Sequence, residues 1–301
     1  MFTTADTPTV SRPPQRTSTT PRSMVRHVRW SLAGTHVLLI ILCAITLFPL
    51  AWMGSTAFKD PAEIFGEGVT LVPTHPTLEN FSEAFNSYPV GQWILNSALV
   101  SVGITLAKLA ISLPAAFAFA QLRFRGQRLL FGFVIGAMIV PYVITIIPNY
   151  TLVSRLHLIN TLPGVIIPSI AFTGFYVFLL RQAMLAVPAE LYDAARVDGA
   201  GTFTLFTRIT LPLVKPAVGA VTVLAFLSSW NLYMWPLLIL DGLNAKTLPV
   251  GLQFFASDLD FGAQQWGALM AATLIAVVPP LLLYVLAQRH ILSAFVDTTS
   301  R

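Results

Sequence analysis

Residues 188–216 read P-A-E-L-Y-D-A-A-R-V-D-G-A-G-T-F-T-L-F-T-R-I-T-L-P-L-V-K-P, and they separate two long apolar runs. The punctuation of this stretch predicts a short helix at Ala189–Val197. A proline precedes that helix and two glycines, Gly199 and Gly201, follow it, which is the usual pattern of a helix start and stop. Asp198 and Gly199 are expected to form the turn at its end.

A second short helix is expected from residue 202 to about residue 210. Pro212 should end it, because proline lacks the backbone N–H that a helix interior needs, and Pro216 should open the next apolar run. The whole stretch 188–216 is therefore expected to form a helix-turn-helix between two apolar segments.

The composition of the first short helix suits contact with another protein. Glu190 lies near the N-terminus of the helix, where the helix dipole stabilises a negative charge. Ala194 and Ala195 carry little side-chain bulk, so another backbone can approach them closely. We therefore expect a small rigid knob between the two apolar segments.

The composition of the chain excludes an ordinary soluble domain. Of 301 residues, 55% are hydrophobic and only 10% are charged, far from the usual soluble balance. The net charge of +5 does not indicate nucleic-acid binding, because the basic residues lie between apolar runs. One cysteine, Cys43, excludes an internal disulfide, and the scattered histidines lack metal-ligand spacing, so no metal site is expected.

Six apolar stretches are long enough to cross a bilayer, which takes roughly 20 residues of helix. These stretches are residues 35–58, 91–119, 129–150, 162–185, 217–240 and 266–288. The sequence thus predicts an all-α integral membrane protein with six transmembrane helices. Residues 1–30 are expected to form a disordered basic tail, and residues 31–301 to form the transmembrane domain.

The distribution of lysine and arginine predicts the orientation, because cytoplasmic loops are enriched in both. With the N-terminus inside, the cytoplasmic side holds Arg12, Arg16, Arg22, Arg26, Arg29, Arg123, Arg125, Arg128, Arg181, Arg196, Arg208, Lys215, Arg289 and Arg301. The other side holds only Lys59, Arg155 and Lys246. Both termini and the 188–216 segment are therefore expected in the cytoplasm. Of two longer outer segments, residues 59–90 are expected to be mostly irregular or short-helical, and residues 241–265 to form a mixed polar and aromatic excursion. Either segment is a candidate contact for an external partner.

The 188–216 segment resembles the EAA loop of binding-protein-dependent ABC importer permeases. The matching positions are Asp193, Ala194, Ala195, Gly199, Ile209, Leu211 and Pro212, with Asp193 in place of the usual glutamate. In that family the loop is the coupling helix, which sits in a cleft of the ATPase subunit. The resemblance implies the same role for these positions, together with Glu190 and Asp198.

The likeness extends over about residues 91–289 and is greatest to carbohydrate-uptake permeases of the maltose-transporter type. The matching landmarks are Asn160-Thr-Leu-Pro163, Leu180-Arg-Gln182, Trp230-Asn231, Pro236-Leu237, Leu248-Pro-Val250 and Gln288-Arg289. The C-terminal tail departs from the family, because it lacks the usual Gly-Ala-rich end.

The resemblance implies a type I importer permease in the bacterial inner membrane that carries a di- or oligosaccharide. Its implied partners are a second related permease, two ATPase subunits that bind ATP and magnesium, an extracytoplasmic solute-binding protein and membrane lipid. This chain would need no cofactor of its own and no nucleic acid.

Several polar and aromatic residues within the spans have two interpretations. Ser228 and Asn231 are candidates for the translocation path, but an interhelical hydrogen bond explains them equally well. Trp230, Tyr233 and Trp235 are expected to form an interfacial belt rather than a sugar-stacking surface. Lys108 is the one charge well inside a span, and we expect its side chain to snorkel towards the cytoplasmic boundary, with a functional role as the alternative.

The sequence does not indicate an enzyme. It contains no Gly-x-x-x-x-Gly-Lys-Ser/Thr loop for ATP phosphates and no recognisable catalytic constellation. The competing function is an ion-coupled secondary transporter or a channel that acts without an ATPase. Such a transporter needs carboxylates within its spans, whereas all thirteen acidic residues fall outside the predicted spans.

Overall fold

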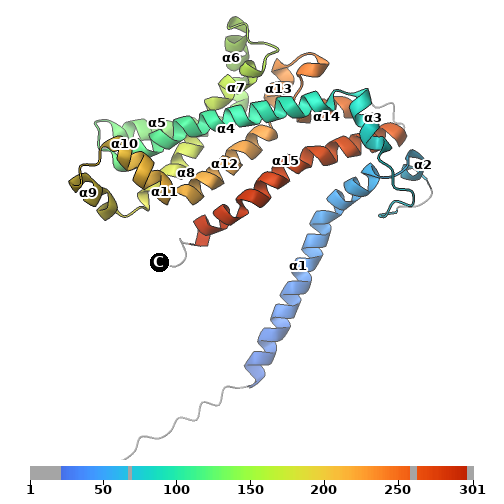
Figure 1. Cartoon of the computed structure of the whole chain (residues 1–301), viewed down its shortest axis with the longest axis horizontal. Coiled ribbons are helices and arrows are strands. Elements are labelled where there is room, and N and C mark those ends of the chain that lie inside the picture. The colour runs from blue at the N-terminus through green and yellow to red at the C-terminus, as the bar shows by residue number, and fades with distance from the viewer. Residues whose placement is uncertain (1–21, 67–69, 258–262, 297–301) are drawn as a thin grey trace, which may run out of the picture. The chain divides into compact units, whose positions relative to one another are not determined.

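The computed structural model describes residues 22–66, 70–257 and 263–296, with side chains for residues 34–66, 70–257 and 265–288. Every regular element in these residues is a helix (Figure 1), which confirms the all-helical prediction. The chain forms two compact units, Met1–Leu50 and Ala51–Arg301. The expected tail at 1–30 and the atypical C-terminal end at 293–301 lie largely outside the described residues.

The first unit is, in its described part, the N-terminal portion of α1 (Arg22–Ala57). The candidate span in this helix covers Gly34–Ala57, within one residue of the prediction. Its large apolar side chains, including Val37, Ile40 and Ile45, are exposed. A helix that pairs its own backbone groups and exposes apolar side chains suits lipid.

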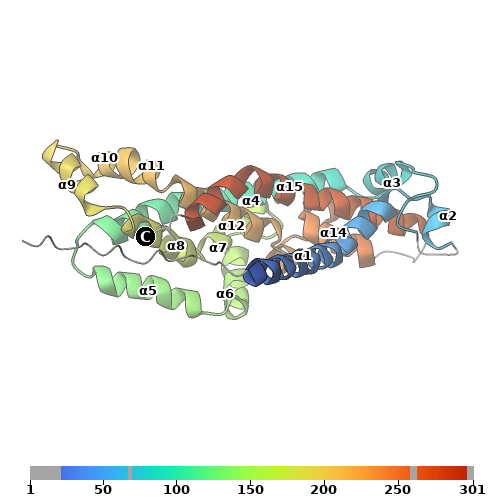
Figure 2. The ribbon, with the colours of Figure 1, turned by 90° about the horizontal axis from the view of Figure 1, so that it is seen from below.

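Three further helices of the second unit are long and apolar enough to cross a membrane alone or nearly so. They are α4 (Val90–Gln121), α12 (Lys215–Trp230), which continues into α13 (Met234–Ile239), and α15 (Ala263–Val296). Figures 1 and 2 show α4 beside α8 and α12, and α12 beside α15. Serine and alanine on the buried face of α4 allow this close packing.

The other two predicted spans are bent pairs of helices rather than straight crossings. The axes of α5 (Gln127–Ile139) and α6 (Tyr142–Arg155) differ by 97°, and those of α7 (Leu162–Ile170) and α8 (Gly174–Leu185) differ by 50°. The predicted span at 129–150 is therefore interrupted at Pro141. Val140 is extended, with φ −67° and ψ 117°, because the ring of the following Pro141 disfavours the helical conformation there.

The first outer segment is short-helical, as predicted. It contains α2 (Pro61–Ile64) and α3 (Glu79–Ser87). The buried Asn80 amide donates to the carbonyls of Ala57 at 3.0 Å and Lys59 at 2.7 Å. Gly267 of α15 approaches the same side chain so closely that a Cβ there would meet Asn80 Oδ1 at 2.3 Å. These contacts hold α3 against α15.

The second outer segment is more ordered than expected. It contains a 3-10 turn, η2 (Leu243–Ala245), and α14 (Leu248–Ser257). Gly251 of α14 packs on the ring of Trp93, whose indole N–H donates to the Leu243 carbonyl at 2.7 Å. The expected mixed polar and aromatic excursion does not describe α14, because the apolar side chains of Leu248, Val250 and Phe255 enter the core.

Two of the three residues of the expected aromatic belt are buried. Trp230 donates its indole N–H to the Ala276 carbonyl at 3.2 Å, and Trp235 donates to the Gly164 carbonyl at 3.1 Å. The belt interpretation is wrong for both tryptophans, because they fill the core between helices and find their acceptors there.

Candidate functional site

The first short helix and its turn form as predicted. α9 (Ala189–Val197) is followed by Gly199 with φ +82°, a conformation that favours glycine. The Gly199 N–H donates to the Arg196 carbonyl at 3.0 Å, and the Ala200 N–H donates to the Ala195 carbonyl at 2.9 Å. This pair of bonds is a Schellman motif, which ends the helix sharply.

The second helix differs from the prediction in its type and its end. It begins as α10 (Thr202–Thr204), widens into a π-helix, η1 (Leu205–Thr210), and continues through α11 (Leu211–Leu213). Pro212 therefore does not end it. The wide turn before Pro212 accommodates the proline ring, which would clash with a carbonyl of a regular α-helix.

Tyr192 joins the two helices of the segment, and the sequence analysis did not single it out. Its side chain is only 1% exposed, and its hydroxyl lies 3.0 Å from Thr210 Oγ1. Because Thr210 donates its own hydrogen to the Leu205 carbonyl at 2.9 Å, Tyr192 is the donor. Burial raises the pKa of the Tyr192 hydroxyl, so this donor stays protonated at neutral pH. A lone aromatic among charged neighbours on a short helix was the available signal.

The opposite face of the segment is exposed and partly apolar. Val197 is 89% exposed and Phe203 is 77% exposed, on either side of the glycine turn. Of the predicted coupling residues, the exposed ones are Glu190, Asp193, Ala194, Asp198, Gly199 and Pro212, and the half-buried ones are Ala195, Ile209 and Leu211. Sequence reasoning missed Val197 and Phe203, although apolar residues flanking a turn in a polar loop were a usable signal.

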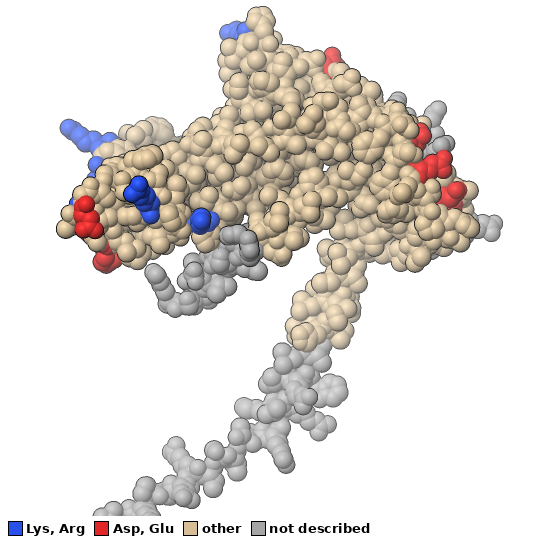
Figure 3. All heavy atoms as spheres, in the orientation of Figure 1, with Lys and Arg blue, Asp and Glu red and all other residues tan. Residues whose placement is uncertain are grey.

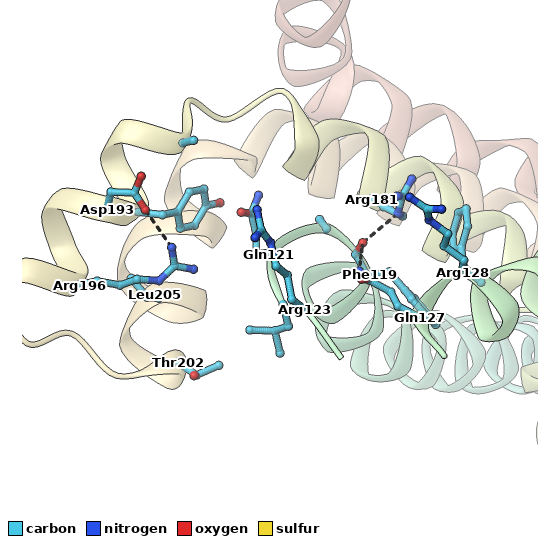
Figure 4. Close-up of a pocket in the computed structure, with 15 residues that line it drawn as sticks. Phe119, Gln121, Arg123, Gln127, Arg128, Arg181, Asp193, Arg196, Thr202 and Leu205 are labelled. Atoms are coloured by element: carbon cyan, nitrogen blue, oxygen red, sulfur yellow. Dashed lines mark hydrogen bonds and ion pairs between the residues drawn. The ribbon is translucent and has the colours of Figure 1, made fainter. Parts of the chain in front are cut away.

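An open cavity of about 900 Å³ lies beside α9, as Figure 4 shows. Four arginines line it, namely Arg123, Arg128, Arg181 and Arg196. Arg196 pairs with Asp193 at 3.0 Å, and Arg181 donates to the Phe119 carbonyl at 3.1 Å. The ion pair is solvent-exposed and contributes at most about 1 kcal/mol. Because the cavity is open and four arginines line it, it is a basic surface rather than a closed binding pocket.

The segment shares a hydrophobic core with the spans. Tyr192 and Leu205 pack in one cluster with Phe117 of α4 and with Leu180 and Met184 of α8. Because protein cores are close-packed and transmit strain, a displacement of α9 would be passed to these spans.

Charged residues gather at the two ends of the second unit. Figure 3 shows lysine and arginine, together with some acidic residues, around the end formed by α9, α10 and α11, and acidic residues around α2 and α3 at the opposite end. The face between them carries little charge.

A second, smaller hollow of about 280 Å³ lies among the spans. Residues of α4, α6, α7, α8 and α12 line it, including Lys108, Tyr176 and Ser228. The Ser228 hydroxyl lies 3.0 Å from the Tyr176 hydroxyl. Asn231 lies beyond the end of α12 and lines a different hollow, of about 340 Å³, so the structure does not bring the two candidate path residues together.

Lys108 does not snorkel, and that expectation is wrong. Its side chain is 7% exposed, and its Nζ lies 4.9 Å from the centre of the Tyr176 ring. Thirteen residues of helix, or about 20 Å, separate it from the Gln121 end of α4 next to α9. Tyr176 and the hollow hold the side chain within the bundle instead.

Apolar helices, broken spans and an exposed helical knob together define a helical membrane protein. The chain belongs to the family of binding-protein-dependent transport system inner membrane components, whose model matches residues 108–295. The family resemblance found in the sequence is thereby confirmed.

Relatives along nearly the whole chain agree with this family. The sn-glycerol-3-phosphate transport system permease protein UgpE of Escherichia coli O1:K1 / APEC is 31% identical over 281 residues, covering 91% of this chain and 99% of the relative. The UgpE protein of Pectobacterium atrosepticum is 33% identical over 270 residues, covering 88% and 95%.

A solved bacterial ABC transporter involved in the import of the acidic polysaccharide alginate has the same fold. It aligns with a TM-score of 0.80 at 23% identity, covering 88% of this chain and 98% of that one. A bacterial alginate ABC transporter in complex with its alginate pentasaccharide-bound periplasmic protein aligns with a TM-score of 0.62 at 18% identity, covering 86% and 92%.

Proposed function

We propose that this chain is a permease subunit of an ATP-driven importer and that its 188–216 segment docks on the ATPase. The observation that carries the proposal is the two-sided construction of the segment. Tyr192 ties it to the core of the spans, while Val197 and Phe203 stay exposed. A rigid knob with an apolar tip can be gripped from outside and can move the helices behind it.

The proposed topology has six crossings, with both termini in the cytoplasm. Four helices are long enough to span a membrane alone, and the count reaches six if each bent pair crosses once. The basic residues around α9 to α11 support a cytoplasmic position for that end.

The proposed partners are those of a binding-protein-dependent importer. A second related permease would complete the pathway, and two ATPase subunits would bind ATP and magnesium. The solute-binding protein would dock on the outer segment 241–265, where residues 241–244 are exposed. Membrane lipid of the bacterial inner membrane would surround the bundle, and no nucleic acid is involved. ATP binding would favour one of two bundle conformations through the knob.

The proposed cargo is a sugar or a sugar-related compound, such as a di- or oligosaccharide. Support comes from the named solutes of the relatives, sn-glycerol 3-phosphate and alginate. Both bear hydroxyl groups and negative charge.

Gly199→Val tests the coupling proposal. Gly199 has φ +82°, which costs a β-branched residue roughly 1–2 kcal/mol, so the turn after α9 should rearrange. In the complex with its companion subunits, we expect the variant to reach the membrane but to lose ATPase-subunit binding and ATP-driven uptake about tenfold or more.

Gly201→Val is the matched control. Gly201 has an ordinary φ of −73°, and a Cβ there meets nothing within 4 Å. We expect this variant to keep binding and uptake. Full ATP-driven uptake by Gly199→Val, or solute movement by the chain without any ATPase, would contradict the proposal.

A further inference from the structure

We propose that the hollow around Lys108 is an anion-binding subsite of the translocation path, which receives a phosphate or carboxylate group of the solute. The inference rests on the proposed transport function and adds the chemical class of the cargo. It concerns residues of this chain that lie within the spans, far from the coupling segment.

The hollow lies where the broken helices of the bundle meet. Tyr142 stands in the first turn of α6 and Tyr176 in the first turn of α8, just after the two bends. Lys108 enters from the middle of α4, and Ser228 from the end of α12. Irregular backbone at membrane depth is tolerated where it lines a cavity, and transporters place solute sites at such breaks.

Lys108 carries a buried charge that no described carboxylate neutralises. Its side chain is 7% exposed, it forms no ion pair within the described residues, and its Nζ faces the ring of Tyr176 at 4.9 Å. The negative face of an aromatic ring attracts a cation but supplies no hydrogen-bond acceptor of the strength of a carboxylate. The three N–H donors of Lys108 are left for a ligand or for water.

Among the hydroxyls around the hollow, only that of Tyr142 keeps an unused donor. Ser228 donates to the Ala225 carbonyl at 2.9 Å, so the contact between Tyr176 and Ser228 uses the Tyr176 hydrogen. Ser169 donates to the Val165 carbonyl at 2.8 Å. The hydroxyl of Tyr142 is buried and has no hydrogen-bond partner among the described residues.

An anion complements this arrangement better than a neutral polyol does. Phosphate and carboxylate oxygens accept several hydrogen bonds. They also carry the negative charge that no described side chain supplies to Lys108. The volume of about 280 Å³ approaches the lower end of the range for small-ligand pockets, roughly 300–1,000 Å³. A positive hollow with low-dielectric walls also concentrates anions from solution.

The test measures the electrostatic preference of the hollow directly, in the full importer complex without ATP. Cys43 is the one native cysteine, so Cys43→Ala provides a background for single introduced cysteines. Ser228→Cys places a thiol in the hollow, and Asn231→Cys places one in the neighbouring hollow as the control. Each cysteine variant is labelled separately with an anionic reagent, sulfonatoethyl methanethiosulfonate, and a cationic one, trimethylammonioethyl methanethiosulfonate. The labelling rate of each reagent is divided by the rate at which the same reagent reacts with free 2-mercaptoethanol.

We expect the normalised anionic-to-cationic ratio to exceed one at Ser228→Cys and to fall about tenfold when Lys108→Met is added. Lys108→Arg should keep the ratio, and the ratio at Asn231→Cys should change less than twofold. Inorganic phosphate should slow labelling at Ser228→Cys only when residue 108 is cationic.

Several outcomes would overturn the proposal. A ratio at or below one with Lys108 present means that another subunit supplies the counter-charge. Slower labelling with phosphatidylglycerol but not with inorganic phosphate means that a lipid headgroup fills the hollow. If Lys108→Met fails to assemble, the Ser228→Cys ratio in chains that keep Lys108 still decides. None of these measurements depends on ATPase coupling, so the Gly199→Val test can fail or succeed independently.

Discussion

At the scale of a single residue, the hydroxyl of Tyr192 links the two helices of the coupling segment through its hydrogen bond to Thr210. Tyr192→Phe keeps the ring in the core but removes the hydrogen bond to Thr210, which is worth about 0.5–1.5 kcal/mol. Tyr192→Ala also removes the ring and should cost about 3–5 kcal/mol, as large aromatic truncations do. Thermal unfolding of the purified complex should rank the two variants in this order.

Leu191→Ala on the same helix is the control, because Leu191 is 44% exposed and its truncation should change stability less than that of the buried Tyr192. The two Tyr192 variants should also weaken ATPase binding in the same order. Equal stability of Tyr192→Ala and the unmodified chain would show that α9 is not anchored through this residue.

At the scale of the element, α14 is fixed by a glycine that contacts an aromatic ring. A Cβ at Gly251 would meet the buried Trp93 ring at 2.2 Å, so Gly251→Ala should push α14 away from α4. Overpacking of this kind costs about 1–3 kcal/mol, and unfolding of the complex would measure it. Gly136→Ala in α5 is the control: its Cβ meets nothing within 4 Å, so helix propensity alone should keep or raise stability. A neutral Gly251→Ala would contradict the close packing.

The elements that the sequence predicted well are those encoded by neighbouring residues. α9 and its turn follow from a proline, a polar amphipathic helix and Gly199, and the structure matches them. The burial of Trp230 and the position of Lys108 were not predictable in this way. Each depends on which helices pack together, and Lys108 has no local signal that distinguishes a hollow from the membrane boundary.

At the scale of the whole molecule, the basic residues that Figure 3 shows around α9, α10 and α11 lead to a test of orientation and docking together. In the Cys43→Ala background, Asn244→Cys marks the proposed outer end and Val197→Cys marks the tip of the coupling segment, and both positions are exposed. An impermeant maleimide added to spheroplasts should label Asn244→Cys at once. It should label Val197→Cys only after permeabilisation, because basic ends of membrane proteins face the cytoplasm.

In permeabilised membranes the ATPase subunits should slow labelling of Val197→Cys about tenfold, since an apolar tip at the centre of an interface is excluded from water. Labelling of Val197→Cys from outside intact spheroplasts would reverse the proposed topology. Labelling that is unaffected by the ATPase would instead leave the topology standing and remove Val197 from the docking surface.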